Sequence, residues 1–148
     1  MHCMICDRIE QAKHQMNPYL VKELQTGYVV IGDHQYFKGY TIFICKEHVR
    51  ELYDLKHEVM MTYLEELAMV SKAVSIAFQA DKMNIESLGN GEAHLHFHLF
   101  PRKDGDTPIK GPVWWLPKEM MYDESNVIKG KALQKMKQQL LNALDALV

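Results

Sequence analysis

The chain has 148 residues, of which 47% are hydrophobic and 24% charged, and its formal net charge is -2. These values are typical of a globular protein, suit a single domain over residues 1–148, and give no sign of a nucleic-acid polymer or a membrane as partner. No apolar run approaches the ~20 residues that cross a bilayer, and polar residues stand where a signal peptide would be apolar, so we expect a cytoplasmic protein.

The first third of the chain predicts a short helix followed by strands. Apolar residues at near-helical spacing predict one or two helical turns over residues 4–11, and Pro18 marks a boundary. Two apolar runs within 19–33 are separated by Gln-Thr-Gly at 25–27, which predicts an antiparallel hairpin. Residues 39–45 are β-branched and aromatic on both faces, which is typical of a central strand.

The remaining elements are a long helix, two strands and a terminal helix. From residue 51 to 80 apolar residues recur every three or four positions, which predicts a long amphipathic helix. Residues 83–88 and 94–102 predict two more strands, and a loop rich in Pro and Gly follows at 103–117. From about residue 126 to the end, apolar residues again recur at helical spacing opposite a row of lysines, which predicts a terminal helix with a solvated face.

This order of elements predicts the fold class. About five strands, one long helix and a C-terminal helix indicate an α+β fold with a mostly antiparallel sheet. We expect a core over about residues 3–102, followed by a C-terminal loop and helix over 103–148. No internal repeat divides the chain further.

Three histidines alternate with apolar residues in the last predicted strand. Successive side chains on a strand point to opposite faces, so His94, His96 and His98 should share one face, roughly 6–7 Å apart. A single strand histidine is usually structural, but three in a row cover a sheet poorly. Because imidazole changes charge near pH 7, such a row indicates a chemical site.

The triplet with the two apolar residues after it resembles the signature of the histidine triad (HIT) family of nucleotide hydrolases and transferases. The resemblance covers about residues 3–102 and includes Lys-Glu-His-Val at 46–49 and Leu-Gly-Asn at 88–90. It implies a HIT-like fold, a homodimer and a purine nucleotide as substrate. It further implies cleavage at the α-phosphate of a nucleoside phosphoramidate or dinucleoside polyphosphate through a nucleotidyl-histidine intermediate. The alternative is a non-catalytic nucleotide-binding or interaction module.

The resemblance also assigns roles within the triplet. In the family the middle histidine takes the nucleotidyl group, which here is His96, and a neutral imidazole attacks phosphorus readily. His98 is then placed to hydrogen-bond the phosphate or to protonate the leaving group. The alternative is that the row only binds phosphate.

Two cysteines near the N-terminus predict a metal site. Structural zinc takes four ligands from Cys and His, and Cys3 and Cys6 supply a close pair. His48 and His94 are the expected partners, and zinc-containing bacterial members of the HIT family carry their ligands at matching positions. A redox pair or two unrelated buried thiols are the alternatives, while Cys45 in an apolar strand is expected to be a core residue.

Five further residues are candidates for substrate binding. Asn90 and Gly91 precede the triplet, where backbone N–H groups and an amide can meet a phosphate, although the family's hydroxyl residue is replaced by Gly91. Asn84 falls within one residue of a phosphate-binding asparagine of the family. Asp33 matches a ribose-binding position but could also form a turn. Arg102 could neutralise phosphate or lie on the surface.

Two adjacent tryptophans lie in the breaker-rich segment after the triplet. Trp114 and Trp115 offer large aromatic faces, which serve either to stack on a base or to pack at a subunit interface. The sequence does not distinguish these roles, so both remain open.

Overall fold

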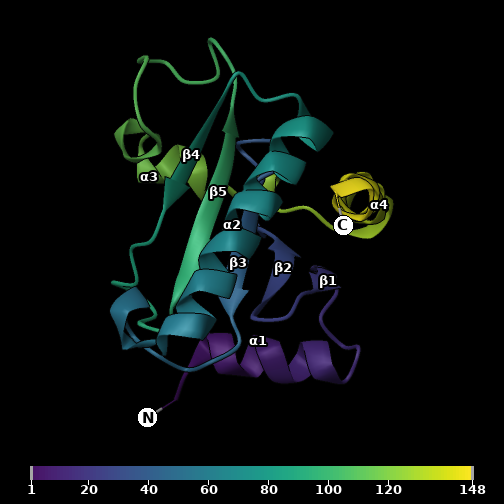
Figure 1. The fold of residues 1–148 in the computed structure, drawn as a ribbon. Helices are drawn as coiled ribbons and strands as arrows, with labels where there is room; N and C mark the ends of the chain where they lie inside the picture. Colours follow the sequence, from purple (N-terminus) through teal and green to yellow (C-terminus); the bar gives the residue numbers. More distant parts are fainter. Residues whose placement is uncertain (1, 148) are drawn as a thin grey trace.

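The computed structural model describes residues 2–147, and within this range five strands form one sheet (Figure 1). The strands are β1 (Leu20–Glu23), β2 (Gly27–Ile31), β3 (Thr41–Cys45), β4 (Lys82–Glu86) and β5 (His96–Arg102). They lie in the order β1-β2-β3-β5-β4, and each neighbouring pair is antiparallel. This confirms the predicted α+β fold with an antiparallel sheet.

The predicted hairpin is formed by β1 and β2, and the long helix holds its turn. The carboxylate of Glu66 accepts hydrogen bonds from the backbone N–H groups of Gln25 and Thr26, at 2.9 and 2.8 Å. A carboxylate that satisfies two turn donors fixes the hairpin against the helix.

Four α-helices accompany the sheet within the described residues. They are α1 (Met4–Lys13), α2 (His57–Phe78), α3 (Lys118–Met121) and α4 (Gly130–Leu147). The sequence prediction missed the short α3, because a single turn between breaker residues carries no periodicity.

The long helix is shorter than predicted, because α2 begins at His57 and not at residue 51. A capping box between Glu51 and Asp54 closes a separate 3-10 turn, η1 (Leu52–Asp54), and the extended Leu55 after it is buried in the core. At the other end Gln79 adopts a left-handed conformation, with φ of 54°, which ends the helix.

One face of the sheet is covered by α2 and α4. Buried side chains of β2, β3 and β5 pack against Val70 and Val74 of α2 and against Leu140 and Leu144 of α4 in one continuous core. Figure 1 shows α2 across this face, with α4 beside it near the β1 edge. This layer is the main hydrophobic core, and it does not cover the opposite face of the sheet.

The opposite face is covered only near its two ends. At one end α1 packs Ile9 and Ala12 on side chains of β2 and β3. At the other end Val113, Leu116 and Met121 pack over Phe37, Tyr40 and Phe100. The middle of this face, where β3 and β5 lie side by side, stays uncovered.

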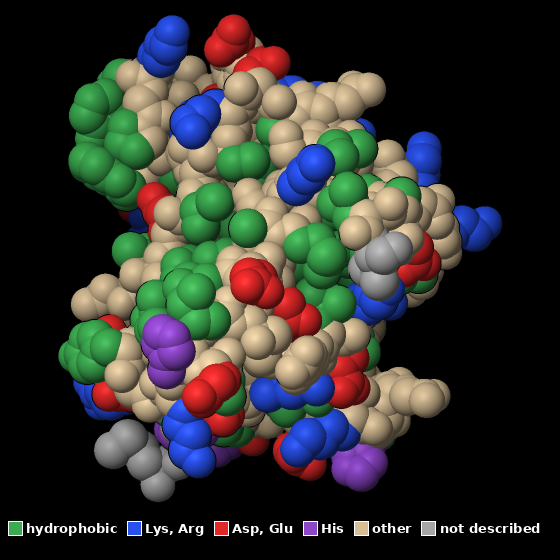
Figure 2. All heavy atoms as spheres, in the orientation of Figure 1, with side chains coloured by type: hydrophobic (Ala, Val, Ile, Leu, Met, Phe, Trp, Pro, Cys, Tyr) green, Lys and Arg blue, Asp and Glu red, His purple; other side chains and the backbone are tan. Residues whose placement is uncertain are grey.

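The surface seen in Figure 2 carries charges of both signs without a field of one sign. Hydrophobic side chains gather there over the segment that precedes α3, where Ile109, Trp114 and Trp115 are exposed. Among residues 2–147, no helix combines the length and the apolar character that a membrane span requires.

Candidate functional site

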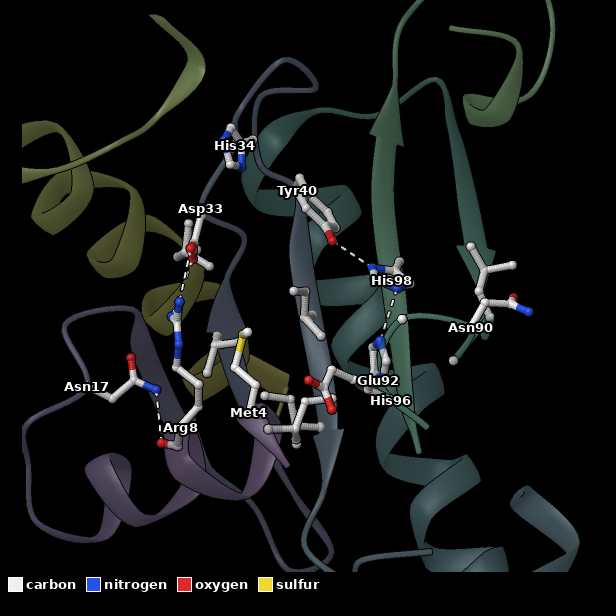
Figure 3. A pocket seen from close by; sticks show the side chains of 18 of the residues that line it. Met4, Arg8, Asn17, Asp33, His34, Tyr40, Asn90, Glu92, His96 and His98 are labelled. Carbon is white, nitrogen blue, oxygen red and sulfur yellow. Dashed lines mark hydrogen bonds and ion pairs between the residues drawn. The ribbon is translucent and has the colours of Figure 1, made fainter. Parts of the chain in front are cut away.

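A cavity of about 470 Å³ opens over the uncovered middle of the sheet (Figure 3). Its apolar floor includes Val30, Ile42 and Ile44, while α1, Tyr122 and the loop of residues 88–92 form its walls. Small-molecule sites commonly have this size and this mainly apolar lining with a few placed polar groups. Those groups include Arg8, Asn17, Asp33, His34, Asn90, Glu92, His96 and His98.

The histidine triplet is divided between two sites. Strand β5 begins at His96, so the strand alternation holds for His96 and His98, whose side chains line the cavity. His94 precedes the strand and lies with Cys3 and Cys6 instead. The structure therefore differs from the predicted row of three on one face, because the strand is two residues shorter than the alternating sequence suggests.

The protons on His96 are fixed by its backbone contact. Its Nδ1 lies 2.6 Å from the carbonyl oxygen of His94. A carbonyl can only accept, so Nδ1 carries the proton, and the neutral ring keeps a lone pair on Nε2. This Nε2 lies 3.1 Å from Nε2 of His98 at the cavity surface. His96 thus presents an unprotonated nitrogen to whatever enters.

His98 is a neutral histidine at physiological pH. Burial lowers its pKa to about 4, and the neighbouring His96 adds to the shift. Its Nδ1 lies 2.6 Å from the hydroxyl of Tyr40, a residue that the sequence did not single out. A neutral His98 can donate a hydrogen bond to a phosphate but does not form an ion pair with it.

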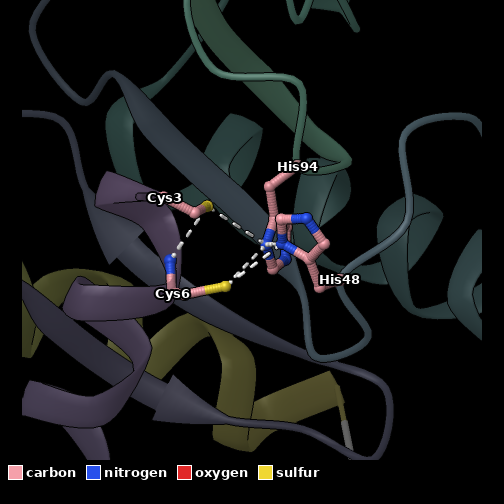
Figure 4. A group of neighbouring side chains, drawn as sticks. All are labelled: Cys3, Cys6, His48 and His94. Carbon is pink, nitrogen blue, oxygen red and sulfur yellow. Dashed lines mark hydrogen bonds between the residues drawn. The ribbon is translucent and has the colours of Figure 1, made fainter. Parts of the chain in front are cut away.

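The second site brings together the four predicted metal ligands (Figure 4). One ligand atom from each of Cys3, Cys6, His48 and His94 lies within 4.8 Å of all the others. Nδ1 of His48 lies 3.2 Å from Nδ1 of His94. Sγ of Cys6 lies 3.2 Å from Nδ1 of His48 and 3.5 Å from Nδ1 of His94, and Sγ of Cys3 lies 3.8 Å from Nδ1 of His94. Ligands around a tetrahedral zinc ion stand about 3.3–3.8 Å apart. The spacing therefore fits a four-coordinate metal.

The second nitrogen of His94 supports the same use. Its Nε2 lies 2.7 Å from the carbonyl oxygen of Cys45, so Nε2 donates and Nδ1 faces the cysteines with a lone pair. Burial lowers the pKa of His94, which favours the neutral form that binds metals. The donor set and the neutral His94 with its proton on Nε2 thus fit a metal ion.

Asp33 lies at the cavity, two residues after β2, and pairs with a residue that the sequence analysis missed. Nη2 of Arg8 on α1 lies 3.1 Å from Oδ2 of Asp33, and both side chains are partly exposed. Arg8 also lies over the ring of Tyr19, 5.7 Å from its centroid. A polar residue beside the apolar Ile5 and Ile9 of the predicted helix was the available signal for Arg8.

The loop before β5 borders the cavity. Residues 88–92, which include Asn90 and Gly91, line it, and Figure 3 shows Asn90 across the cavity from Asp33. Gly89 has φ of +74°, a conformation that favours glycine and lets this loop turn back towards β5.

His34 and Tyr122 line the cavity too, with their rings edge-to-face at 5.2 Å, and the sequence analysis missed both. Each lies in an irregular segment, so no periodicity marked them. Trp114 and Trp115 lie outside the cavity lining, are 68% and 50% exposed, and contact each other edge-to-face.

Arg102 and Asn84 lie together but away from the cavity. The guanidinium of Arg102 donates to both carboxylate oxygens of Asp106, at 2.8 and 2.9 Å, and to Oδ1 of Asn84 at 2.9 Å. It also donates to the carbonyl oxygen of Gly111. The structure thus brings these two predicted phosphate ligands to the loop after β5, whose ends they hold against the sheet.

Replacing Arg102 with methionine should therefore destabilise the fold. Loss of the guanidinium leaves the partly buried Asp106 carboxylate without its cation, which costs about 2–3 kcal/mol of unfolding free energy in urea titrations. Lys103→Met, at the exposed neighbour, is the matched control and should change stability by less than about 0.5 kcal/mol. Weaker nucleotide binding with unchanged stability would instead support the predicted phosphate-binding role of Arg102.

A comparison with known protein families identifies the family of this chain. The model of the HIT domain matches residues 19–105, more than half of the sequence, and this stretch contains the whole histidine triplet. The chain belongs to the HIT family. A curated relative, the protein hit of Bacillus subtilis, is 26% identical over 106 residues, which cover 64% of this chain and 72% of that protein.

Solved structures of HIT proteins share the fold. A histidine triad protein from Marinobacter aquaeolei is 25% identical, with a TM-score of 0.72 over 87% of this chain and 90% of that one. One from Sinorhizobium meliloti is 19% identical, with a TM-score of 0.73 over 84% and 87%. A Zn-bound HIT family protein from Mycobacterium smegmatis is 19% identical, with a TM-score of 0.67 over 99% and 96%.

Proposed function

We propose that this HIT protein is a nucleotide hydrolase or nucleotidyl transferase that uses His96 as its nucleophile. Its substrate would be a nucleoside phosphoramidate or a dinucleoside polyphosphate, cleaved at the α-phosphate, with a purine as the expected base. The observation that carries the proposal is the lone pair on Nε2 of His96, which the carbonyl of His94 fixes at the cavity surface. A non-catalytic nucleotide-binding module remains the alternative.

The proposed reaction has two displacements at phosphorus. In the first, Nε2 of His96 forms a bond to the α-phosphorus, and the bond to the leaving group breaks. A polyphosphate leaves as an anion, whereas an amine takes a proton from water. In the second, water attacks, the N–P bond breaks, and a nucleoside monophosphate leaves with the water oxygen while the water proton passes to solvent.

The other residues bind and orient the nucleotide in this proposal. The Nε2–H of His98 donates to a phosphate oxygen, where a placed donor stabilises charge that develops in the transition state. The loop with Asn90 and Gly91 supplies further donors to phosphate. Asp33 accepts from the ribose hydroxyls, and Arg8 holds its carboxylate in place.

Asp33→Ala should raise the KM for a ribonucleotide substrate about tenfold or more, since the hydroxyls lose a charged acceptor. The same variant should change the KM for the 2′,3′-dideoxy analogue by less than about threefold, because that analogue has no hydroxyls to lose. Steady-state kinetics with both substrates measure the difference. Asp104→Ala, at an exposed position outside the cavity, is the control. Equal losses on both substrates would contradict the ribose role.

We also propose that Cys3, Cys6, His48 and His94 hold a structural zinc ion. The interligand spacing and the hydrogen-bonded Nε2 of His94 support this, as does the Zn-bound relative. A bound zinc ion would supply only a closed crosslink, which ties the start of α1, one wall of the cavity, to the residues before β5.

Three broader expectations complete the proposal. The chain would act as one domain, in the cytoplasm, and as a homodimer. β4 forms one edge of the sheet and exposes Ile85, which offers a surface for pairing two copies. Light scattering on the protein as it elutes from a size-exclusion column would measure its molar mass and so test the dimer.

A crystal structure with a nucleoside monophosphate tests the whole site at once. The expected result has the phosphorus within about 3.5 Å of Nε2 of His96 and the ribose against Asp33. A phosphate bound elsewhere, or a nucleotide turned with its base towards the histidines, would overturn the proposed reaction.

A further inference from the structure

We propose that Tyr40 is a positioning residue of the active site, whose hydroxyl donates to Nδ1 of His98 and thereby holds the His98 proton on Nε2, facing the cavity. The tautomer assignment follows from the hydrogen-bond chain with both imidazole rings in their neutral form. Its importance for turnover rests on the proposed function, in which His98 donates to a phosphate oxygen.

The proton positions on both histidines follow from a series of hydrogen bonds that begins at the backbone carbonyl of His94, which can only accept. The carbonyl of His94 accepts from Nδ1 of His96 at 2.6 Å, so a neutral His96 has no proton on Nε2. The contact of 3.1 Å between Nε2 of His96 and Nε2 of His98 then needs its proton from His98. A neutral His98 with that proton on Nε2 has a bare Nδ1. Its partner at 2.6 Å, the Tyr40 hydroxyl, must therefore be the donor.

Tyr40 is built into the fold as a fixed donor. It is buried, and its ring stacks on Phe100 with centroids 4.3 Å apart and planes 10° apart. Gly32 makes room for the ring, because a Cβ at this glycine would lie 2.2 Å from the Tyr40 ring. Burial raises the pKa of the phenol far above its ordinary value, so the hydroxyl keeps its proton.

This arrangement matters because the two neutral tautomers of His98 do different things. With the proton on Nε2, His98 offers a donor to a phosphate oxygen and, on doing so, releases the lone pair of His96 for attack. With the proton on Nδ1, His98 offers phosphate only a lone pair, which repels it. Without the Tyr40 donor, the solvent-shielded Nδ1 would have no partner and the second tautomer would become competitive.

The test measures the tautomer directly. In imidazole 15N NMR spectra of the metal-replete protein, with the His98 signals identified by their loss in His98→Asn, we expect a protonated Nε2 and a bare Nδ1. Tyr40→Phe should shift both His98 nitrogens towards the opposite tautomer and lower kcat about 10- to 100-fold, with KM within about threefold.

Tyr63→Phe is the matched control. Tyr63 is also buried but lies in the core between α2 and the sheet, where its hydroxyl donates to the carbonyl oxygen of Phe43 at 3.1 Å. It should leave the His98 spectrum and kcat unchanged.

The outcomes separate this inference from the proposed function. A wild-type His98 protonated on Nδ1 would overturn the inference, even if Tyr40→Phe failed to fold. An unshifted His98 spectrum in Tyr40→Phe would also overturn it, whatever happens to kcat. A shifted spectrum in a protein that turns over no nucleotide would support the inference about Tyr40 and count against the proposed reaction.

Discussion

Replacing His96 with alanine should lower turnover of an adenosine phosphoramidate or a dinucleoside polyphosphate by at least about 10⁴-fold, because the attacking nitrogen is removed. The fold should persist, since His96 lies at a cavity surface and not within the main core. Nucleotide affinity should change by less than about tenfold, because the sugar and base contacts remain. Steady-state kinetics, calorimetric binding and circular dichroism measure the three effects.

Two further variants make this result specific. His96→Gly leaves a space beside the cavity that added imidazole can enter, so imidazole should restore part of the lost turnover. His57→Ala, at an exposed histidine at the start of α2, should leave kinetics unchanged. Wild-type rates in His96→Ala would refute the nucleophile assignment.

Loss of the metal should have the largest effect on stability. Cys6→Ser replaces a thiolate ligand, so the purified protein should lose its zinc and about 3 kcal/mol or more of unfolding free energy, with Tm lower by about 10 °C. The physical reason is that the ion crosslinks α1 to the residues before β5, and α1 otherwise rests mainly on Ile9 and Ala12. Elemental analysis and scanning calorimetry measure the two losses.

Cys45→Ala is the control for this experiment. Cys45 is buried in the core, and only its backbone carbonyl contacts the metal site, where it accepts a hydrogen bond from Nε2 of His94. This variant should therefore keep a full complement of zinc. Wild-type protein without zinc, and with Cys3 and Cys6 oxidising readily to a disulfide, would favour the redox alternative instead.

The sequence predicted the main elements because each has a regular pattern. The alternation around the triplet identified β5, and the three-to-four spacing identified α2 and α4. The ends of elements were less predictable: the capping box that separates η1 from α2 depends on two side chains, Glu51 and Asp54, which periodicity does not register.

The site was predictable where neighbouring residues or the family resemblance link its members, and less so where its walls come from other distant segments. Cys3, Cys6, His48 and His94 could be grouped because the family resemblance links them. Tyr40 could not, because its contact with His98 depends on the pairing of β3 with β5, where Ile42 lies opposite His98.

The same dependence on strand pairing explains why Arg102 and Asn84 lie away from the cavity. Both lie on the cavity side of the sheet, but β4 pairs with β5 so that Asn84 lies opposite Phe100 and not opposite the histidines. Their side chains then meet Asp106 in the loop that follows β5. A sequence match within one residue cannot resolve such a displacement.

The most direct test is to trap the covalent intermediate. The protein is mixed with a substrate labelled at the α-phosphate, quenched during turnover under conditions that preserve phosphoramidates, digested, and mapped by mass spectrometry. The proposed reaction predicts the nucleotidyl group on His96 in the wild type and no adduct in His96→Ala. Turnover without any adduct, or an adduct on another residue, would contradict it.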